Sequence, residues 1–195
     1  MLVSEICRSA EEADPLEERL VEIKRHFEFS EWRGTVKVPD RRIARITIEA
    51  ADLAQYGEIR ISTPVEQRED ELTFNILGDE NTSGVSVDIS LHEDALEAQE
   101  WLVRGFQAVS APLELYEKAT EGGPMDIGDV CIFAKESTPP PGTVQVNGRP
   151  YCAVIMFTRN NVLVTIRNNP EEGKAYADII ELARYIDQKL VDSLE

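Results

Sequence analysis

The stretch that decides the fold is Tyr151-Cys-Ala-Val-Ile-Met-Phe-Thr-Arg-Asn-Asn-Val-Leu-Val-Thr-Ile-Arg167. Two runs rich in β-branched and aromatic residues flank the polar pair Asn160-Asn161, a pattern typical of two antiparallel strands joined by a tight turn. Asparagine suits such a turn because it tolerates a positive φ. The sequence therefore predicts a hairpin with strands over 151–157 and 162–167.

Periodic patterns on either side of this hairpin predict further elements. An amphipathic helix is expected over 175–191, where apolar residues recur at helical spacing. These residues are Ile179, Leu182, Ala183, Ile186 and Leu190. Alternation of apolar and polar residues predicts half-buried strands over 72–77 and 85–89. Ser90-Leu-His-Glu93 has the capping-box pattern, so a helix is expected to run from there to 106.

Weaker signals complete the predicted order of elements. Asp14-Pro15 is typical of a helix start, because it combines an N-cap acceptor with a proline at the first helical position. A short helix is expected over 112–119, and Asn147-Gly148 favours a type I′ hairpin turn. The other predicted strands lie over 43–48, 58–62, 129–134 and 144–146.

These elements predict one α+β domain over residues 1–195, with helices packed on one face of an antiparallel sheet. The opposite face is expected to be wetter, because its side chains are mostly polar. They are Thr73, Asn75, Ser86, Asp88, Thr165 and Arg167. The order strand, loop, strand, helix occurs in both halves, about 10–106 and 112–192, and this predicts a pseudo-duplicated α-β₄-α unit. Chance recurrence of that order is the alternative, because the halves share negligible sequence identity.

The C-terminal third carries a more specific pattern. It consists of Gly128-Asp129 before a strand, the hairpin Phe157-Thr-Arg-Asn-Asn-Val-Leu-Val164, and the helix Ile180-Glu-Leu-Ala-Arg-Tyr-Ile-Asp-Gln-Lys-Leu190. This part resembles the C-terminal end of many uncharacterised bacterial α+β domains, which are commonly exported or lipid-anchored. The resemblance implies the α+β fold and favours an extracytoplasmic setting. It implies no site residue, because those domains have no generally assigned activity.

Charge and hydropathy exclude several classes of protein. The chain has 37 acidic and 20 basic residues, for a formal net charge of −17. Such a chain repels phosphate backbones and anionic lipid, so no nucleic-acid partner is expected. The acidity either keeps the protein soluble or matches a basic protein partner or a cation. No apolar run approaches the roughly 20 residues that span a bilayer, so no membrane insertion is expected.

The cellular compartment of the protein determines whether its cysteines can form disulfides. The first residues, Met-Leu-Val-Ser-Glu-Ile-Cys-Arg, lack the regions of a secretory signal. We expect a soluble protein, either cytoplasmic or a mature extracytoplasmic domain without its signal peptide. Cys7, Cys131 and Cys152 form no CxxC pair, so no disulfide framework or structural zinc site is predicted. Cys131 and Cys152 are expected to be small buried hydrophobes, or to pair across neighbouring strands if the protein is extracytoplasmic.

The sequence lacks the motifs that carry most enzyme chemistry. There is no GxxxxGK[ST] or GxGxxG phosphate loop and no GxSxG nucleophile turn. The two histidines are His26 and His92, and His92-Glu-Asp94 lacks the second histidine of the HExxH motif. The cysteines lie in predicted strands or near the N-terminus rather than beside a base. We therefore expect no catalytic residue, no cofactor and no metal site.

Four residues are candidates for binding: Trp32, Arg159, Asn160 and Asn161. Trp32 lies in an aromatic cluster after the first predicted helix, where it either anchors that helix or presents a recognition patch. Arg159 is placed to meet an anionic partner. Asn160 and Asn161 also suit the turn itself, without any role in binding.

The sequence predicts a non-catalytic binding or accessory domain that interacts with another protein. The alternative is a small-molecule carrier that holds an apolar ligand between the sheet and the helices. A third interpretation is an enzyme that uses carboxylates and a divalent cation. The expected partners are accordingly a protein, a small-molecule ligand or a second copy of the chain in a homodimer.

Overall fold

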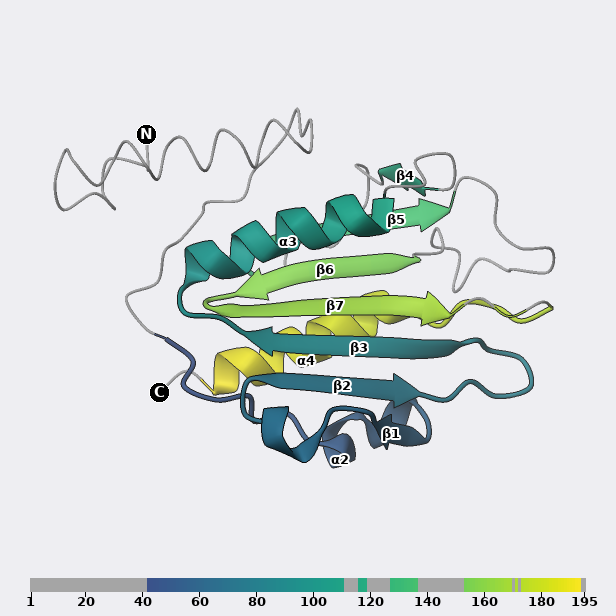
Figure 1. Cartoon of the computed structure of the whole chain (residues 1–195). Helices are drawn as coiled ribbons and strands as arrows, with labels where there is room; N and C mark the ends of the chain where they lie inside the picture. The colour runs from purple at the N-terminus through teal and green to yellow at the C-terminus, as the bar shows by residue number, and fades with distance from the viewer. Residues whose placement is uncertain are drawn as a thin grey trace, which may run out of the picture.

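A computed structural model describes residues 42–110, 116–118, 127–136, 153–169, 171 and 173–193. In these residues one antiparallel sheet has the strand order β1-β2-β3-β7-β6-β5-β4 (Figure 1). The strands are β1 (Ile59–Ile61), β2 (Glu71–Ile76), β3 (Gly84–Leu91), β4 (Tyr116–Lys118), β5 (Val130–Glu136), β6 (Val154–Arg159) and β7 (Val162–Asn169). The helices are α2 (Ala50–Leu53), α3 (Ala95–Ser110) and α4 (Ile179–Asp192), with short 3₁₀ helices at Ala54–Tyr56 and Val65–Gln67. The predicted α+β class with an antiparallel sheet is confirmed.

The central strands β3 and β7 bring two distant parts of the chain together. They pair antiparallel from Gly84 opposite Asn169 to Leu91 opposite Val162. β2 pairs with β3, and β6 pairs with β7 across a tight turn that contains Asn160. Asn160 has a φ of 54°, the positive value that asparagine tolerates better than most residues. The turn predicted from the sequence is therefore confirmed.

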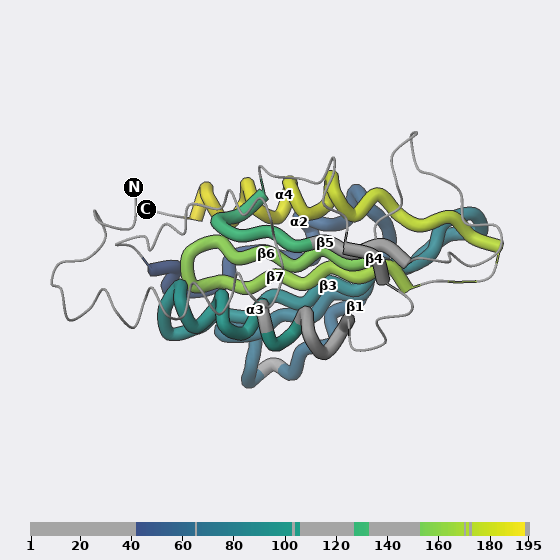
Figure 2. Tube along the Cα trace, turned by 90° about the horizontal axis from the view of Figure 1, so that it is seen from above, coloured from purple at the N-terminus to yellow at the C-terminus, as the bar shows by residue number. Residues whose placement is uncertain are grey.

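One face of the sheet packs against α4 and forms the main core. Alternate side chains of the strands point to this face, and they include Leu72, Phe74, Ile76, Val85, Val87, Ile89, Ile155, Phe157, Val164 and Ile166. α4 contributes the apolar stripe that the sequence predicts. Each residue of the stripe is at most 2% exposed, and these residues are Ile179, Leu182, Ala183, Ile186 and Leu190. Figure 2 shows α2 and α4 on the same side of the sheet.

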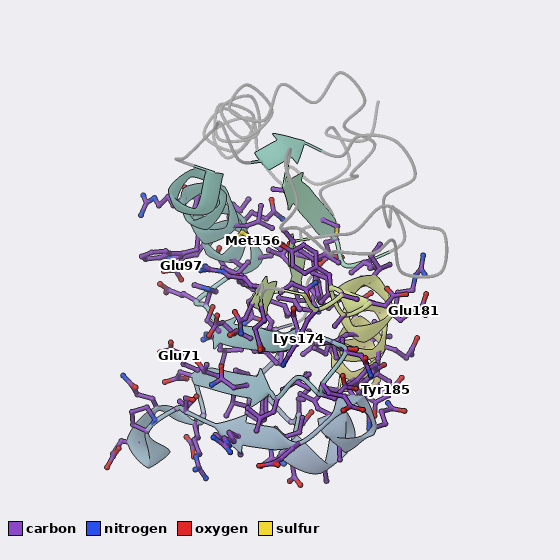
Figure 3. The ribbon with its side chains drawn as sticks, turned by 90° about the vertical axis from the view of Figure 1, so that its right-hand side faces the viewer. Glu71, Glu97, Met156, Lys174, Glu181 and Tyr185 are labelled. Carbon is purple, nitrogen blue, oxygen red and sulfur yellow. The ribbon has the colours of Figure 1, made fainter. Side chains whose placement is uncertain are left out.

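The opposite face carries α3, so the two long helices do not share one face as predicted (Figure 2). α3 packs over β6 and β7, and a Cβ added to Gly105 would lie 2.7 Å from Met156 Cε. In Figure 3 Glu97 lies on the α3 side of the sheet, and Glu181 and Tyr185 lie on the α4 side.

The composition of β6 and β7 explains why both faces are covered. All side chains from 154 to 158 and from 162 to 166 are buried. Strands of this kind have two apolar faces rather than one, so each face has to be shielded from water. Helices on a single face would have left Val154, Met156 and Leu163 in solvent.

Two local predictions are wrong. Segment 42–49 forms no strand, although Ile43, Ile46 and Ile48 in it are 2–8% exposed. Residues 116–118 form strand β4 beside β5 instead of part of a helix, because pairing with a neighbouring strand outweighs local helix propensity.

The start of α3 also differs from the prediction. β3 continues to Leu91, so the helix begins at Ala95, and Asp94 Oδ1 accepts a hydrogen bond from Glu97 N (2.7 Å). The predicted helix after Asp14 and the predicted turn at Asn147-Gly148 lie outside the described residues. The α-β₄-α duplication stays a prediction. No helix in the described ranges is long and apolar enough to cross a membrane.

Candidate functional site

The side of the sheet that carries α3 is only half covered. α3 lies over β6 and β7, where Thr165 is 7% exposed, whereas β2 and β3 keep half-buried or exposed side chains on this side. We call this surface the open face. It consists of Arg60, Glu71, Thr73, Asn75, Ser86, Asp88, Ser90 and Arg167. The wetter face expected from the sequence is thus confirmed along β2 and β3 and wrong at Thr165.

Hydrogen bonds between side chains cross the open face from strand to strand. Asn75 Nδ2 donates to Ser62 Oγ (2.6 Å), and Ser86 Oγ donates to Asn75 Oδ1 (3.2 Å). Asn169 Nδ2 donates to Ser86 Oγ (2.9 Å), so the contacts reach from the end of β1 to β7. These bonds fix the side chains in place, which reduces the conformational entropy that a partner would have to remove on binding.

Charges of both signs lie on the open face. Arg60 and Arg167 are exposed and lie in the same row of residues across β1, β2, β3 and β7. Because neighbouring strands are about 4.8 Å apart, the backbone positions of the two arginines, three strands apart, are roughly 14 Å from each other. In the next row Thr73 Oγ1 donates to Asp88 Oδ1 (2.9 Å). The surface therefore offers charged and neutral hydrogen-bonding groups at fixed spacing.

An exposed tryptophan borders the open face. Trp101 on α3 is 46% exposed. Its ring stacks with that of His92 at 6.2 Å between centroids, and the Arg104 guanidinium carbon lies 5.5 Å from the Trp101 centroid. His92 follows β3 directly, and its Nε2 lies 2.9 Å from Ser90 Oγ, which belongs to the open face. We call His92, Trp101 and Arg104 the Trp101 stack.

The contact between Ser90 and His92 raises the question of nucleophilic catalysis. Burial lowers the pKa of His92 below its ordinary value, and the charge of Glu97 offsets part of that effect, so the imidazole is mostly uncharged at neutral pH. A triad also needs an acid that orients the imidazole. Glu97 instead accepts a hydrogen bond from Glu93 N (2.7 Å). Among the described residues, no carboxylate completes a triad with this pair.

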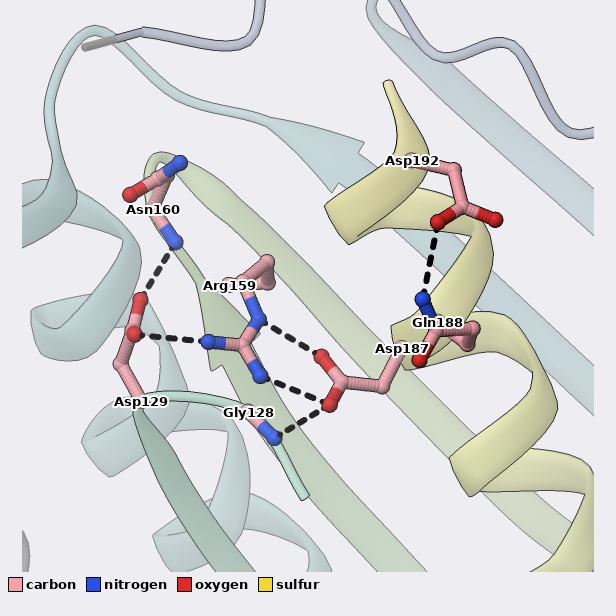
Figure 4. Close-up of polar contacts among 7 residues, drawn as sticks. All are labelled: Gly128, Asp129, Arg159, Asn160, Asp187, Gln188 and Asp192. Atoms are coloured by element: carbon pink, nitrogen blue, oxygen red, sulfur yellow. Dashed lines mark hydrogen bonds and ion pairs between the residues drawn. The ribbon is translucent and has the colours of Figure 1, made fainter. Parts of the chain in front are cut away.

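A second polar cluster lies at the turn between β6 and β7 (Figure 4). Arg159 Nε and Nη2 donate to the two carboxylate oxygens of Asp187, both at 2.7 Å, and Nη1 donates to Asp129 Oδ1 (3.1 Å). Asp187 Oδ2 also accepts from Gly128 N (3.0 Å), and Asp129 Oδ2 accepts from Asn160 N (2.6 Å). We call these five residues the Arg159 cluster. It joins the start of β5, the turn and α4.

The charges of the Arg159 cluster compensate one another inside the protein. The side chain of Arg159 is 19% exposed, and those of Asp129 and Asp187 are 9% exposed. Burial alone would lower the pKa of Arg159, but the hydrogen bonds and charges of Asp187 and Asp129 outweigh it and raise the pKa. Gly128 has a φ of 66°, and a Cβ there would lie 2.5 Å from Thr158 O. Glycine is therefore required at position 128, where the backbone passes close to Thr158 of β6.

Asn161 holds the segment before α2 against the turn. Its Oδ1 accepts from Ile43 N (2.8 Å), and its Nδ2 donates to Ile43 O (3.1 Å) and to His92 O (2.8 Å). The residue is 2% exposed. These bonds satisfy the backbone N–H and C=O groups of Ile43, although segment 42–49 has no strand partner.

The sequence-predicted binding residues have different positions in the structure. Arg159, Asn160 and Asn161 lie together, with the Arg159 and Asn161 side chains and the Asn160 N–H bonded inside the chain. Trp32 lies outside the described residues. Their role in binding stays a prediction. Sequence reasoning missed the pairing of Arg159 with Asp187, for which the available signal was an aspartate beside the apolar stripe of α4.

No group of three or more histidine, cysteine, aspartate or glutamate side chains in the described part of the chain is arranged to hold a metal ion. No family model, no curated protein and no solved structure matches the chain. The function proposed below therefore rests on the geometry of the open face and the Trp101 stack.

Proposed function

We propose that the chain is a non-catalytic protein-interaction domain that binds its partner through the open face and the Trp101 stack. The observation that carries this proposal is the exposure of Trp101, at 46%, beside a sheet face that α3 leaves uncovered. Large aromatic side chains are usually withdrawn from water, and an exposed one beside ordered polar groups is typical of a binding surface.

The chemistry of this surface favours a protein as the partner. Tryptophan and arginine are the residues most enriched among those that dominate protein–protein binding energy, and Trp101 and Arg104 lie in contact. Around them the open face supplies hydroxyl, amide and carboxylate groups, as a polar rim does. The net charge of −17 steers a basic protein toward the chain and repels a nucleic-acid backbone.

Site-specific photo-crosslinking in cells of the source organism tests this proposal. A photoreactive amino acid at Asn75 on the open face is expected to capture a partner, whereas the same amino acid at the exposed Gln188 on α4 is expected not to. Equal capture at both positions, or capture only at Gln188, would contradict the proposed binding surface.

Affinity measurements on the captured partner sharpen the test. Trp101→Ala is expected to weaken binding by about tenfold to hundredfold, as loss of a central aromatic residue does. Gln188→Ala is the control and is expected to leave the affinity unchanged, because that residue is exposed on α4, on the other side of the sheet. An unchanged affinity of the folded Trp101→Ala protein would show that the Trp101 stack is not part of the interface.

A small-molecule carrier is the second candidate, and two buried polar side chains favour it. Gln99 on α3 is 1% exposed and Thr158 on β6 is 0% exposed. Among the described residues, neither the Gln99 amide nor the Thr158 hydroxyl has a hydrogen-bond partner, and a buried polar group without a partner is costly in a protein interior. Both side chains lie on the α3 side of the sheet, where a ligand with a polar group would satisfy them.

Native mass spectrometry of gently purified protein tests the carrier proposal. Excess mass over the 21.9 kDa chain that disappears on denaturation is expected for a carrier, together with loss of that mass in Gln99→Leu. A bare chain mass, with Gln99→Leu more stable than the wild type, would contradict it, because the leucine would then only remove an unpaired amide.

A further inference from the structure

We propose that the edge strand β1 pairs antiparallel with β1 of a second copy of the chain, so that two sheets join into one. β1 is the outer strand at one end of the sheet order in the described residues. An outer strand presents unpaired N–H and C=O groups, which form a template for another strand. This inference does not depend on the function proposed for the open face.

The hydrogen bonds to β2 show which groups of β1 face outward. Ser62 N donates to Thr73 O, and Leu77 N donates to Glu58 O, both at 2.9 Å. In an antiparallel pair, alternate residues bond to the same neighbouring strand. The backbone N–H and C=O groups of Ile59 and Ile61 therefore point away from β2, toward the edge of the sheet where no described strand pairs with β1.

The side chains of this edge carry both apolar and charged groups. Ile61 is 39% exposed and is one of the few large exposed hydrophobic residues among those described. Glu58 and Arg60 alternate with the isoleucines on the opposite side of the strand, and their side chains are 69% and 66% exposed. Their own contact is long, at 3.5 Å between Arg60 Nη2 and Glu58 Oε1, so both charges remain accessible to another chain.

The sequence of β1 is self-complementary in one register. When Ile59 lies opposite Ile59 of the second copy, Glu58 of each copy faces Arg60 of the other. Opposite charges directly across an antiparallel pair stabilise it, and like charges destabilise it. In the next register that uses the same backbone groups, Ile59 faces Ile61 and the two Arg60 side chains oppose each other. Charge therefore selects the first register.

This pairing also buries the exposed isoleucine. The side chains of Ile59 and Ile61 point to the core face of the sheet, because their partners in β2 are Ile76 and Phe74. In this register the two Ile59 side chains meet across the junction, and Ile61 lies opposite Gly57 of the second copy, diagonal to its Ile59, so the apolar layer extends across the junction. The interface is small because β1 has three residues, so a weak, salt-sensitive dimer is expected.

Charge reversal with rescue tests the inference in solution. The molar mass of the full chain is measured by light scattering and by sedimentation, at about 1 to about 200 µM, the range in which small interfaces associate. The wild type is expected to approach twice 21.9 kDa as concentration rises. Glu58→Arg and Arg60→Glu are each expected to stay monomeric, because each change places like charges opposite one another.

The double variant Glu58→Arg/Arg60→Glu is expected to dimerise again, because it restores opposite charges in the same register. Arg45→Glu, which changes an exposed arginine outside β1, is the matched control and is expected to dimerise like the wild type. A wild type that is monomeric throughout would overturn the inference. A dimer that persists in both single variants would overturn it as well, since another surface would then hold the copies together.

Discussion

The covered half and the open half of the sheet satisfy the same need for burial in different ways. β6 and β7 lie between α3 and α4 and are buried on both faces, whereas β2 and β3 bury only the face toward the α4 core. Their sequences differ accordingly. Val-Ile-Met-Phe at the start of β6 is a continuous apolar run, and Leu-Thr-Phe-Asn-Ile in β2 alternates. Alternation of apolar and polar residues thus indicates a strand with one solvent-facing side. A continuous apolar run indicates a strand that other elements cover on both faces.

The polar groups of the two halves differ in the same way. In the covered half, the charges of the Arg159 cluster are shielded and paired with one another. In the open half, Asn75 and Ser86 form a ladder of neutral side chains that water also reaches. Removing one partner of a shielded ion pair leaves a buried charge without compensation. Removing one of the hydrogen bonds on the open face leaves polar groups that water can reach. Substitutions in the covered half should therefore cost more stability.

The largest effect is expected from a charge placed under the covered half. Ile186→Asp puts an unpaired carboxylate into a position that is 0% exposed, and we expect it to lower the free energy of unfolding by about 4 kcal/mol or more. Denaturant unfolding followed by circular dichroism measures this change. Val191→Asp is the matched control, because that residue is 37% exposed on the same helix. Equal stability of the two variants would show that α4 is not docked on the sheet.

The next largest effect is expected in the Arg159 cluster. Arg159→Met leaves Asp187 without its two-bonded partner in a largely buried site, so we expect a loss of about 3 kcal/mol in the free energy of unfolding. The double variant Arg159→Met/Asp187→Leu is expected to recover part of that loss, because it removes the unpaired Asp187 charge, whereas Asp129 still lacks its contact with Arg159 and Gly128 N still lacks its bond to Asp187. A cost below about 1 kcal/mol for the single variant would indicate that water solvates Asp187 freely.

A third pair of substitutions compares the two halves directly, on the same side of the sheet. Met156 under α3 is 1% exposed, and we expect Met156→Ala to cost about 2 kcal/mol because it leaves a cavity beside Gly105. Asn75→Ala on the open face is expected to cost under about 1 kcal/mol, since water replaces its hydrogen bonds. Thermal unfolding of both variants measures the difference. An equal cost would mean that the open face is covered in solution.

Much of the fold could be predicted because each element has a strong local pattern. The stripe of α4, the alternation of β2 and β3 and the turn at Asn160 all depend on residues close in sequence. The side on which α3 lies could not be predicted in this way. It depends on β6 having two apolar faces, whereas the prediction of helices on one face takes the sheet to have a single apolar face. Strand β4 was missed because its pairing with β5 is not a property of Tyr116-Glu-Lys itself.

The candidate site could be predicted only in part. The polar residues of the open face follow from alternation, so Thr73, Asn75, Ser86 and Asp88 were placed correctly. The contact between His92 and Trp101 depends on how α3 turns after β3, which spacing alone does not give. The partners of Arg159 lie 28 and 30 residues away in sequence, so an arginine that looked available for a ligand is held inside the chain.

The smallest effect is expected from pH at the Trp101 stack, where the two halves meet. The pKa of His92 is lowered by burial, partly offset by Glu97, so the folded protein takes up a proton at lower pH than the unfolded chain does. Stability is then at its full value above the ordinary histidine pKa of about 6.5 and decreases as the pH falls below it.

For one proton the slope of this decrease cannot exceed about 1.4 kcal/mol per pH unit. Urea unfolding between about pH 7.5 and 5.5 measures it, in a range above that in which the carboxylates titrate. His92→Gln is expected to flatten the profile, because it removes the imidazole that takes up this proton. If the free energy of unfolding of this variant has the same slope against pH, another group takes up the proton. His92 would then be as accessible to water as the side chains of the open face beside it.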